Sequence, residues 1–220
     1  MSVTHENKRQ ALKARFARKD IVTAPGIFDM ISAKMADSMG FDCLYMTGFG
    51  TVASYLGLPD AGLATYTDMV DRVAAFCGGT NTPMICDGDT GYGGLLNVAH
   101  TVRGYEHAGA AGIQLEDQEF PKKCGHTPGR RVIAMQDMVR KIEVAVESRT
   151  DSNFQIVART DARTSLGLDE ALRRGEAYGL VGESGCGKST LAMAALRYLP
   201  RNGKVKAGKI VIAGKDVHKL

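Results

Sequence analysis

Short apolar runs alternate with amphipathic helical segments along most of this 220-residue chain, and this alternation limits the fold more than any other feature. The expected strands lie at residues 21–24, 43–46, 84–86, 113–115 and 154–158. Helical spacing between them is clear in places, as where Phe28, Ile31, Met35 and Met39 precede Gly40. Strand–helix repeats of this length are typical of a parallel sheet, in either a doubly wound layer or a (β/α)₈ barrel.

The positions of polar residues favour the barrel. Thr47, Asp87, Asp89, Glu116 and Arg159 all follow the C-terminal ends of successive expected strands. Barrels place their active sites at this face, whereas an open sheet gathers such residues at one switch point. The sequence therefore predicts an α/β chain with five β/α units of a partial (β/α)₈ barrel.

Composition narrows the function and the compartment. The net charge is +4 and the basic residues are scattered, which gives no case for nucleic acid as a partner. The first 20 residues lack the apolar core of a signal peptide, and no run approaches the ~20 apolar residues of a membrane span. Five widely spaced cysteines fit a reducing compartment. We expect a cytoplasmic protein without membrane insertion.

Four carboxylates form the first candidate site. Asp87, Asp89 and Glu116 come from two neighbouring strand ends, and Asp60 precedes them in a less regular segment. Carboxylate oxygens are the ligands that Mg²⁺ prefers. The alternative is that an aspartate only caps the following turn or helix, which is the simpler interpretation for Asp87 or Asp89 alone. The four together favour a metal site.

The loop over residues 119–131 carries the second candidate site. It contains Lys122, Lys123, Cys124, Gly125 and His126 in succession. Positive charge beside a thiol favours its thiolate form, which would suit Cys124 for giving or taking a proton. A solvated basic loop with an incidental cysteine explains the same spacing equally well. The cysteines in apolar runs, by contrast, are expected in the core: Cys43, Cys77 and Cys86.

Two further strand ends carry polar groups with alternative roles. Arg159, followed by Asp161, could bind a substrate carboxylate or form a structural ion pair. The segment over residues 47–50 could offer backbone N–H groups to an oxyanion, or it could be only a turn.

From these motifs, residues 4–178 resemble the isocitrate lyase and phosphoenolpyruvate mutase superfamily. Asp87-Gly-Asp89-Thr-Gly-Tyr-Gly is similar to the metal-binding stretch of that superfamily, and residues 122–126 resemble the cysteine loop of its lyase branch. The resemblance implies a (β/α)₈ barrel that uses Mg²⁺, or Mn²⁺, on small 2-oxo and 2-hydroxy acids through enolate intermediates. It is strongest to 2-methylisocitrate lyases, oxaloacetate decarboxylases and related acid lyases.

The resemblance also implies roles for single residues. Asp87 would bind the metal directly, while Asp60, Asp89 and Glu116 would act through metal-bound water. Cys124 would serve as general acid or base, with Lys123 and His126 beside it in the catalytic loop. The implied substrate-binding residues are Thr47, Gly48, Phe49, Gly125 and Arg159.

The pattern changes after Tyr178. Residues 179–220 contain the P-loop motif Gly-x-x-x-x-Gly-Lys-Ser between an apolar strand and a helical run, and residues 209–213 are expected to form a following strand. Its nucleotide-binding positions are Gly182, Gly185, Gly187, Lys188, Ser189 and Thr190. The segment resembles the beginning of an ABC-transporter ATPase of the peptide-uptake type, which implies ATP as a second ligand.

Two partial domains are therefore expected, an incomplete acid-lyase barrel at 1–178 and an ATP-binding fragment at 179–220. The predicted function is Mg²⁺-dependent cleavage of a carbon–carbon bond, or decarboxylation, in a small di- or tricarboxylic acid, impaired by truncation of the barrel. The alternatives are a nucleotide-binding module and an inactive chimera. The superfamily resemblance implies homo-oligomers that exchange a C-terminal helix, and this sequence has no counterpart of that helix.

Overall fold

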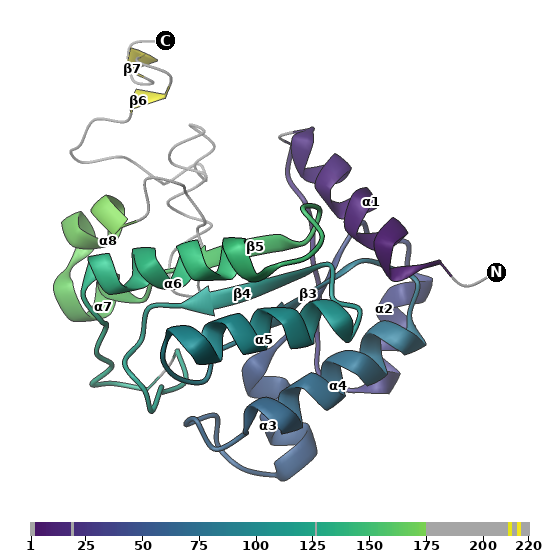
Figure 1. Ribbon diagram of the computed structural model, residues 1–220, viewed down its shortest axis with the longest axis horizontal. Helices are drawn as coiled ribbons and strands as arrows, with labels where there is room; N and C mark the ends of the chain where they lie inside the picture. The colour runs from purple at the N-terminus through teal and green to yellow at the C-terminus, as the bar shows by residue number, and fades with distance from the viewer. Residues whose placement is uncertain (1–2, 19, 126, 175–210, 213–214, 217–220) are drawn as a thin grey trace, which may run out of the picture. The chain divides into compact units, whose positions relative to one another are not determined.

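The computed structural model describes residues 3–18, 20–125, 127–174, 211–212 and 215–216. The chain divides into two compact units, Met1–Glu176 and Ala177–Leu220. The first contains a parallel sheet whose five strands lie side by side in the order of the sequence, and Figure 1 labels the last three of them. These strands are β1 (Gly26–Ile27), β2 (Leu44–Met46), β3 (Met84–Asp87), β4 (Gly112–Glu116) and β5 (Gln155–Arg159).

This strand order decides between the two predicted architectures. A doubly wound sheet reverses its order at a switch point, whereas consecutive strands of a barrel are always neighbours. The sheet shows no reversal within the described residues, and each strand is parallel to the next. The first unit is thus built as five β/α units of a (β/α)₈-type barrel, as the sequence predicts.

Helices accompany the strands in the same order. The helices are α1 (His5–Ala17), α2 (Met30–Ser38), α3 (Gly48–Leu56), α4 (Tyr66–Gly79), α5 (Leu95–His107), α6 (Met135–Ser148), α7 (Ala162–Leu166) and α8 (Leu168–Arg174). Contacts link α2 to α4, α4 to α5 and α5 to α6, so these four form one continuous layer. Figure 1 shows α4, α5 and α6 running beside the strands.

Local sequence explains where these helices begin. Asp29 precedes α2 and accepts a hydrogen bond from the Ser32 backbone N–H, while the Ser32 hydroxyl accepts one from the Asp29 N–H. Thr65 and Asp68 form the same reciprocal pair at the start of α4. Such capping boxes satisfy backbone donors that have no partner inside the helix.

The core lies between the sheet and the helix layer. Met46, Cys86 and Ile113 from three strands are completely buried and belong to one cluster with Val102 and Tyr105 of α5. Burial of side chains of this size stabilises the fold by about 1.5–3 kcal/mol each, which makes this cluster the main support of the strand ends. All three cysteines that the sequence places in the core are buried: Cys43, Cys77 and Cys86.

Two predicted elements differ in the structure. The expected strand at 21–24 is wrong: these residues are not a strand, Ile21 is exposed, and β1 lies further along at Gly26–Ile27. Pairing decides the difference, because Gly26 and Ile27 lie opposite Tyr45 and Met46 of β2. The segment over residues 47–50, for which a turn is one of the two alternatives, instead starts the helix α3, with Thr47 as its N-cap.

The second unit is described at four residues, where β6 (Val211–Ile212) pairs antiparallel with β7 (Lys215–Asp216). Val211 and Ile212 fall inside the strand predicted at 209–213. The rest of that strand and the P-loop positions lie outside the described residues. Among the described helices, none combines the length and the apolar character needed to cross a bilayer.

Candidate active site

Three acidic side chains meet where β3 and β4 end. Asp87 is the last residue of β3, Glu116 is the last residue of β4, and Asp89 follows Asp87 by two positions. The backbone holds the two ends together, since the Glu116 N–H donates to the Asp89 carbonyl over 2.8 Å. All three side chains are buried. Register alone therefore brings together the carboxylates that the sequence predicts at one place.

Asp87 does not cap the helix that follows it in the sequence. That helix, α5, begins at Leu95 with Gly94 as its N-cap. The Asp87 carboxylate instead accepts hydrogen bonds from the Asp89 N–H (2.9 Å) and from the Gly48 N–H (3.2 Å). A Cβ on residue 48 would lie 2.6 Å from Asp87 Oδ2, so the contact requires glycine at this position.

Lys122 supplies the positive charge for this cluster. Its Nζ lies 2.5 Å from Asp60 Oδ1 and 2.6 Å from Asp89 Oδ1, and all three side chains are buried. Burial works against the charged ammonium, but Asp89, Asp87 and Asp60 together hold the pKa of Lys122 above its ordinary value. The alternative of a solvated basic loop does not hold for Lys122, because three carboxylates attract its ammonium into the interior.

The pKa values of two of the buried acids, Asp89 and Glu116, lie above their ordinary values. Burial, reinforced by repulsion from Asp87, raises the pKa of Asp89 to about 7, although Lys122 opposes the rise. Burial also raises the pKa of Glu116. Repulsion from Asp87 and Asp89 adds to this rise, and attraction to the Arg159 guanidinium opposes it. Buried acids with raised pKa values are typical of functional sites, where a bound cation or proton compensates their charge.

The donor set fits a hard divalent cation. Glu116 Oε1 is buried and has no hydrogen-bond partner among the residues that the structure describes, while Glu116 Oε2 faces Arg159. Within the described part of the chain, no three His, Cys, Asp or Glu side chains are arranged to hold a metal directly. Mg²⁺ commonly binds through one or two carboxylates and keeps several waters, so this arrangement suits one direct ligand with the other acids bonded to metal-bound water.

Arg159, the last residue of β5, lies opposite Glu116 in the β4–β5 ladder. Its guanidinium is 3.2 Å from Glu116 Oε2 and 3.1 Å from Asp161 Oδ1. Burial opposes its charge, but Glu116 and Asp161 hold the pKa of Arg159 above the ordinary value. The Arg–Asp pair that the sequence suggests is present, and the guanidinium is also directed toward the carboxylate cluster.

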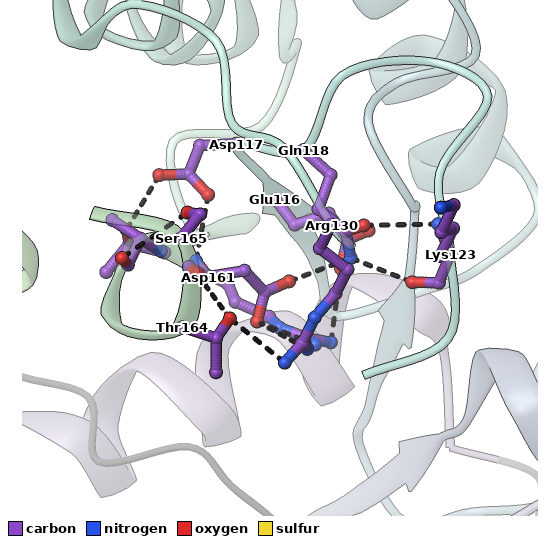
Figure 2. Close-up of polar contacts among 11 residues, drawn as sticks. Glu116, Asp117, Gln118, Lys123, Arg130, Asp161, Thr164 and Ser165 are labelled. Carbon is purple, nitrogen blue, oxygen red and sulfur yellow. Dashed lines mark hydrogen bonds and ion pairs between the residues drawn. The ribbon is translucent and has the colours of Figure 1, made fainter. Parts of the chain in front are cut away.

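Polar contacts between Gln118 and Lys123 anchor the loop that contains Cys124 (Figure 2). The Gln118 side chain bonds both the N–H and the carbonyl of Lys123, over 3.1 and 3.0 Å. Cys124 is partly buried, and a Cβ on Gly125 would lie 3.4 Å from Arg159 Nη2. His126 lies outside the described residues. The structure thus brings the loop to the edge of the strand-end site.

The segment after β2 reaches the same site through its backbone. Thr47 is the N-cap residue of α3 and its hydroxyl donates to the Ile27 carbonyl over 3.3 Å. The Gly48 N–H is already bonded to Asp87, and Phe49 is exposed. Of the predicted oxyanion donors, Gly48 therefore supports the carboxylate cluster.

Several residues that organise the site were not predicted. Asp117 accepts hydrogen bonds from the Thr160 hydroxyl (2.6 Å) and the Asp161 N–H (2.8 Å), which ties the ends of β4 and β5 together. Gln118 also donates to Asp161 Oδ2 over 2.9 Å. Polar triplets at the ends of two neighbouring strands, residues 116–118 and 159–161, are the sequence feature from which these contacts could have been predicted.

A cavity of about 750 Å³ lies between the end of the loop and α7. Its lining includes Thr127, Arg130 and Thr164. The lining contains none of the strand-end carboxylates, so the cavity borders the candidate site without containing it.

Comparison with known proteins decides the family. The profile of the family described as phosphoenolpyruvate phosphomutase matches residues 12–186. The chain belongs to the isocitrate lyase/phosphoenolpyruvate mutase superfamily. A second profile, described as ABC transporter, matches residues 166–220.

Relatives within the superfamily include several lyases. The chain is 51% identical over 172 residues to 2,3-dimethylmalate lyase of Eubacterium barkeri, which covers 78% of the chain and 60% of that relative. It is 44% identical over 167 residues to 2-methylisocitrate lyase of Aeropyrum pernix, covering 76% of the chain and 53% of that relative. The chain thus spans between about half and three fifths of the length of these two superfamily members.

Solved structures of the superfamily share the fold. Oxaloacetate acetylhydrolase in complex with the inhibitor 3,3-difluorooxalacetate is 40% identical with a TM-score of 0.72, covering 78% of this chain and 58% of that one. Phosphonopyruvate hydrolase in complex with oxalate and Mg²⁺ is 31% identical with a TM-score of 0.74, covering 93% and 70%.

Proposed function

We propose that the chain carries the metal-binding half of a carbon–carbon lyase that acts on small 2-hydroxy or 2-oxo di- or tricarboxylic acids. The observation that carries the proposal is the buried cluster of Asp60, Asp87, Asp89 and Glu116 at the C-terminal strand ends, with Arg159 and the Cys124 loop beside it. The lyases among the relatives, and a relative solved with oxalate and Mg²⁺, support the same chemistry.

Asp87 is the proposed direct ligand of Mg²⁺, or of Mn²⁺. Asp60, Asp89 and Glu116 would accept hydrogen bonds from water molecules bound to the metal. A bound divalent cation would polarise the substrate oxygen at C2 and stabilise negative charge that develops there. Glu116 has the unpartnered oxygen for such a contact. Lys122 balances part of the acidic charge, so that the cluster remains folded around the cation.

The protein groups would then control substrate position and the proton. Arg159 binds a substrate carboxylate, which suits a guanidinium at the edge of the site. The residues proposed to lie against the rest of the substrate are Thr47, Gly48, Phe49 and Gly125, with the Gly48 N–H remaining bonded to Asp87. For a 2-hydroxy acid, the C2 hydroxyl gives its proton to a carboxylate of the buried cluster and C2 becomes the carbonyl carbon of a 2-oxo acid. The bond between C2 and C3 breaks, and its electron pair passes to the C3 fragment, which leaves as an enolate. Cys124 delivers a proton to the enolate carbon, assisted by Lys123 and His126.

The test is release of a 2-oxo acid from 2,3-dimethylmalate and 2-methylisocitrate by the whole chain with Mg²⁺. Turnover that depends on Mg²⁺ and is lost in Cys124→Ser with Mg²⁺ binding retained supports the proposal. Unchanged 2,3-dimethylmalate lyase gives the positive reference for the assay. Equal loss of turnover and of Mg²⁺ binding in Cys124→Ser would remove the proton-transfer role.

A second function rests on the other end of the chain. We propose that residues 1–178 and 179–220 derive from two families, and that the P-loop of the second part binds ATP. The ABC transporter match at 166–220 and the motif with Lys188 and Ser189 support this. Protection of Lys188 from amine modification by ATP, absent in Ser189→Ala, is the expected result. An inactive chimera predicts neither 2-oxo acid release nor ATP protection.

A further inference from the structure

Gln118 is a buried amide whose hydrogen bonds all point toward the loop and β5. It follows the end of β4 by two positions and is almost completely buried. Its Nε2 donates to the Lys123 carbonyl (3.0 Å) and to Asp161 Oδ2 (2.9 Å), while its Oε1 accepts from the Lys123 N–H (3.1 Å). These three bonds fix the orientation of the amide, since a flipped amide would face the Lys123 N–H with its own donor.

The bonds to Lys123 act on the backbone directly before Cys124. Gln118 bonds to the backbone N–H and the backbone carbonyl of Lys123 at the same time. The Cys124 carbonyl accepts from the Thr127 N–H over 2.8 Å. The two ends of the loop are joined separately, where Gln118 pairs with Val132 and the Glu119 N–H donates to the Arg131 carbonyl. The loop can therefore stay closed at its base while the position of Cys124 depends on the Gln118 side chain.

The third bond links this anchor to the arginine of the site. Asp161 Oδ2 accepts from Gln118 (Figure 2), and Asp161 Oδ1 lies 3.1 Å from Arg159 Nη2. Arg130 approaches the same Oδ1 to 3.7 Å and donates to the Thr164 hydroxyl over 3.1 Å. Asp117, which is buried, fixes the Asp161 backbone N–H. Asp161 is thus held rigidly between Gln118 and Arg159.

We propose that Gln118 is a positioning residue: its amide fixes Cys124 relative to Arg159 by clamping the Lys123 backbone and bonding to Asp161. The proposal rests on the proposed function, because that function assigns the proton to Cys124 and the substrate carboxylate to Arg159. The clamp itself is a property of the chain without any ligand.

Hydrogen exchange of the whole chain without ligand tests the clamp. Gln118→Met keeps the volume of the side chain and removes its three bonds. Amide exchange of the peptide spanning residues 119–125 should rise by roughly tenfold or more. The two bonds from Gln118 to the Lys123 backbone are then lost, and they no longer oppose local opening of the loop. Alkylation of Cys124 by iodoacetamide should accelerate with it, while the buried Cys43, Cys77 and Cys86 stay unreactive.

Gln114→Met is the matched control. Gln114 is a buried amide within β4, and its Nε2 has no hydrogen-bond partner among the described residues. Loop exchange in Gln114→Met should stay within about twofold of the unchanged chain, since no bond to the loop is lost. Unchanged loop exchange in Gln118→Met overturns the proposal. An equal rise in both variants also overturns it, because the loop would then respond only to general loosening.

A second variant covers the case in which Gln118→Met does not fold. Gln118→Glu keeps the acceptor for the Lys123 N–H, loses the donors and places a carboxylate against Asp161, so faster loop exchange is again expected. A loop as protected as in the unchanged chain would contradict the clamp. Oxalate with Mg²⁺ forms a separate arm: failure to slow loop exchange in the unchanged chain counts against the proposed function, while the ligand-free comparison alone decides the clamp.

Discussion

The strand-end carboxylates and the Cys124 loop meet at one site but are held there by different means. Asp87 and Glu116 are members of the sheet, and the register of β3, β4 and β5 fixes their backbones. Between its paired ends, the loop is held largely by side chains, with Lys122 bound to two acids and Gln118 bound to Lys123. The carboxylate part of the site is therefore a property of the fold, whereas the position of the Cys124 loop depends on a few polar contacts.

Removing the buried ammonium should break this comparison most strongly. Lys122→Met leaves Asp60 and Asp89 buried with no partner cation, and breaking a buried pair in this way costs about 3–5 kcal/mol. Denaturant unfolding measures the loss, and millimolar Mg²⁺ should restore part of it by binding the freed carboxylates.

Lys123→Met is the control for that change. Lys123 is exposed and its ammonium donates to the Gly129 carbonyl over 3.2 Å, so its removal should cost less than about 1 kcal/mol. Similar losses in the two variants would mean that Lys122 is not the tie between the loop and the acids.

These two regions also differ in how far the sequence predicts them. Short apolar runs and helical spacing place the strands from β2 to β5, and parallel register then brings Asp87 and Glu116, with Asp89 beside them, to one edge of the sheet. The first strand was misplaced because Ile21 to Ala24 is as apolar as a strand, while pairing with β2 selects Gly26 and Ile27. The apolar pattern of the sequence does not show which residues pair with β2.

The loop could be recognised from its motif but not positioned. Two consecutive lysines look alike in sequence, yet Lys122 is buried against carboxylates that lie far from it along the chain, and Lys123 is exposed. Burial of Gln118 and Asp117 is equally invisible, since polar residues after a strand are most often solvated. Contacts between side chains of distant segments decide these cases.

A smaller effect follows from the raised pKa of Asp89, about 7. Without metal, the folded chain retains a proton that the unfolded chain releases near pH 4, so stability should fall as pH rises from about 4 to 7. The raised pKa of Glu116 acts in the same direction. Thermal unfolding across this range measures the slope, and Asp89→Asn should flatten it.

Mg²⁺ should reverse this trend. A cation competes with protons for the same carboxylates, so the stabilisation by Mg²⁺ should be larger at pH 8 than at pH 5.5. Stabilisation by Mg²⁺ that is equal at both pH values would show that the cation binds away from the buried acids.

The central claim is that the buried carboxylates at the ends of β3 and β4 bind a divalent cation through Asp87. Calorimetric titration of the whole chain with Mg²⁺ tests it most directly, beside Asp87→Asn and the control Asp71→Asn, which changes an exposed residue of α4. We predict saturable binding that Asp71→Asn retains and that Asp87→Asn weakens by more than about tenfold, because a direct carboxylate ligand is lost. Equal Mg²⁺ affinity in all three proteins would contradict the claim.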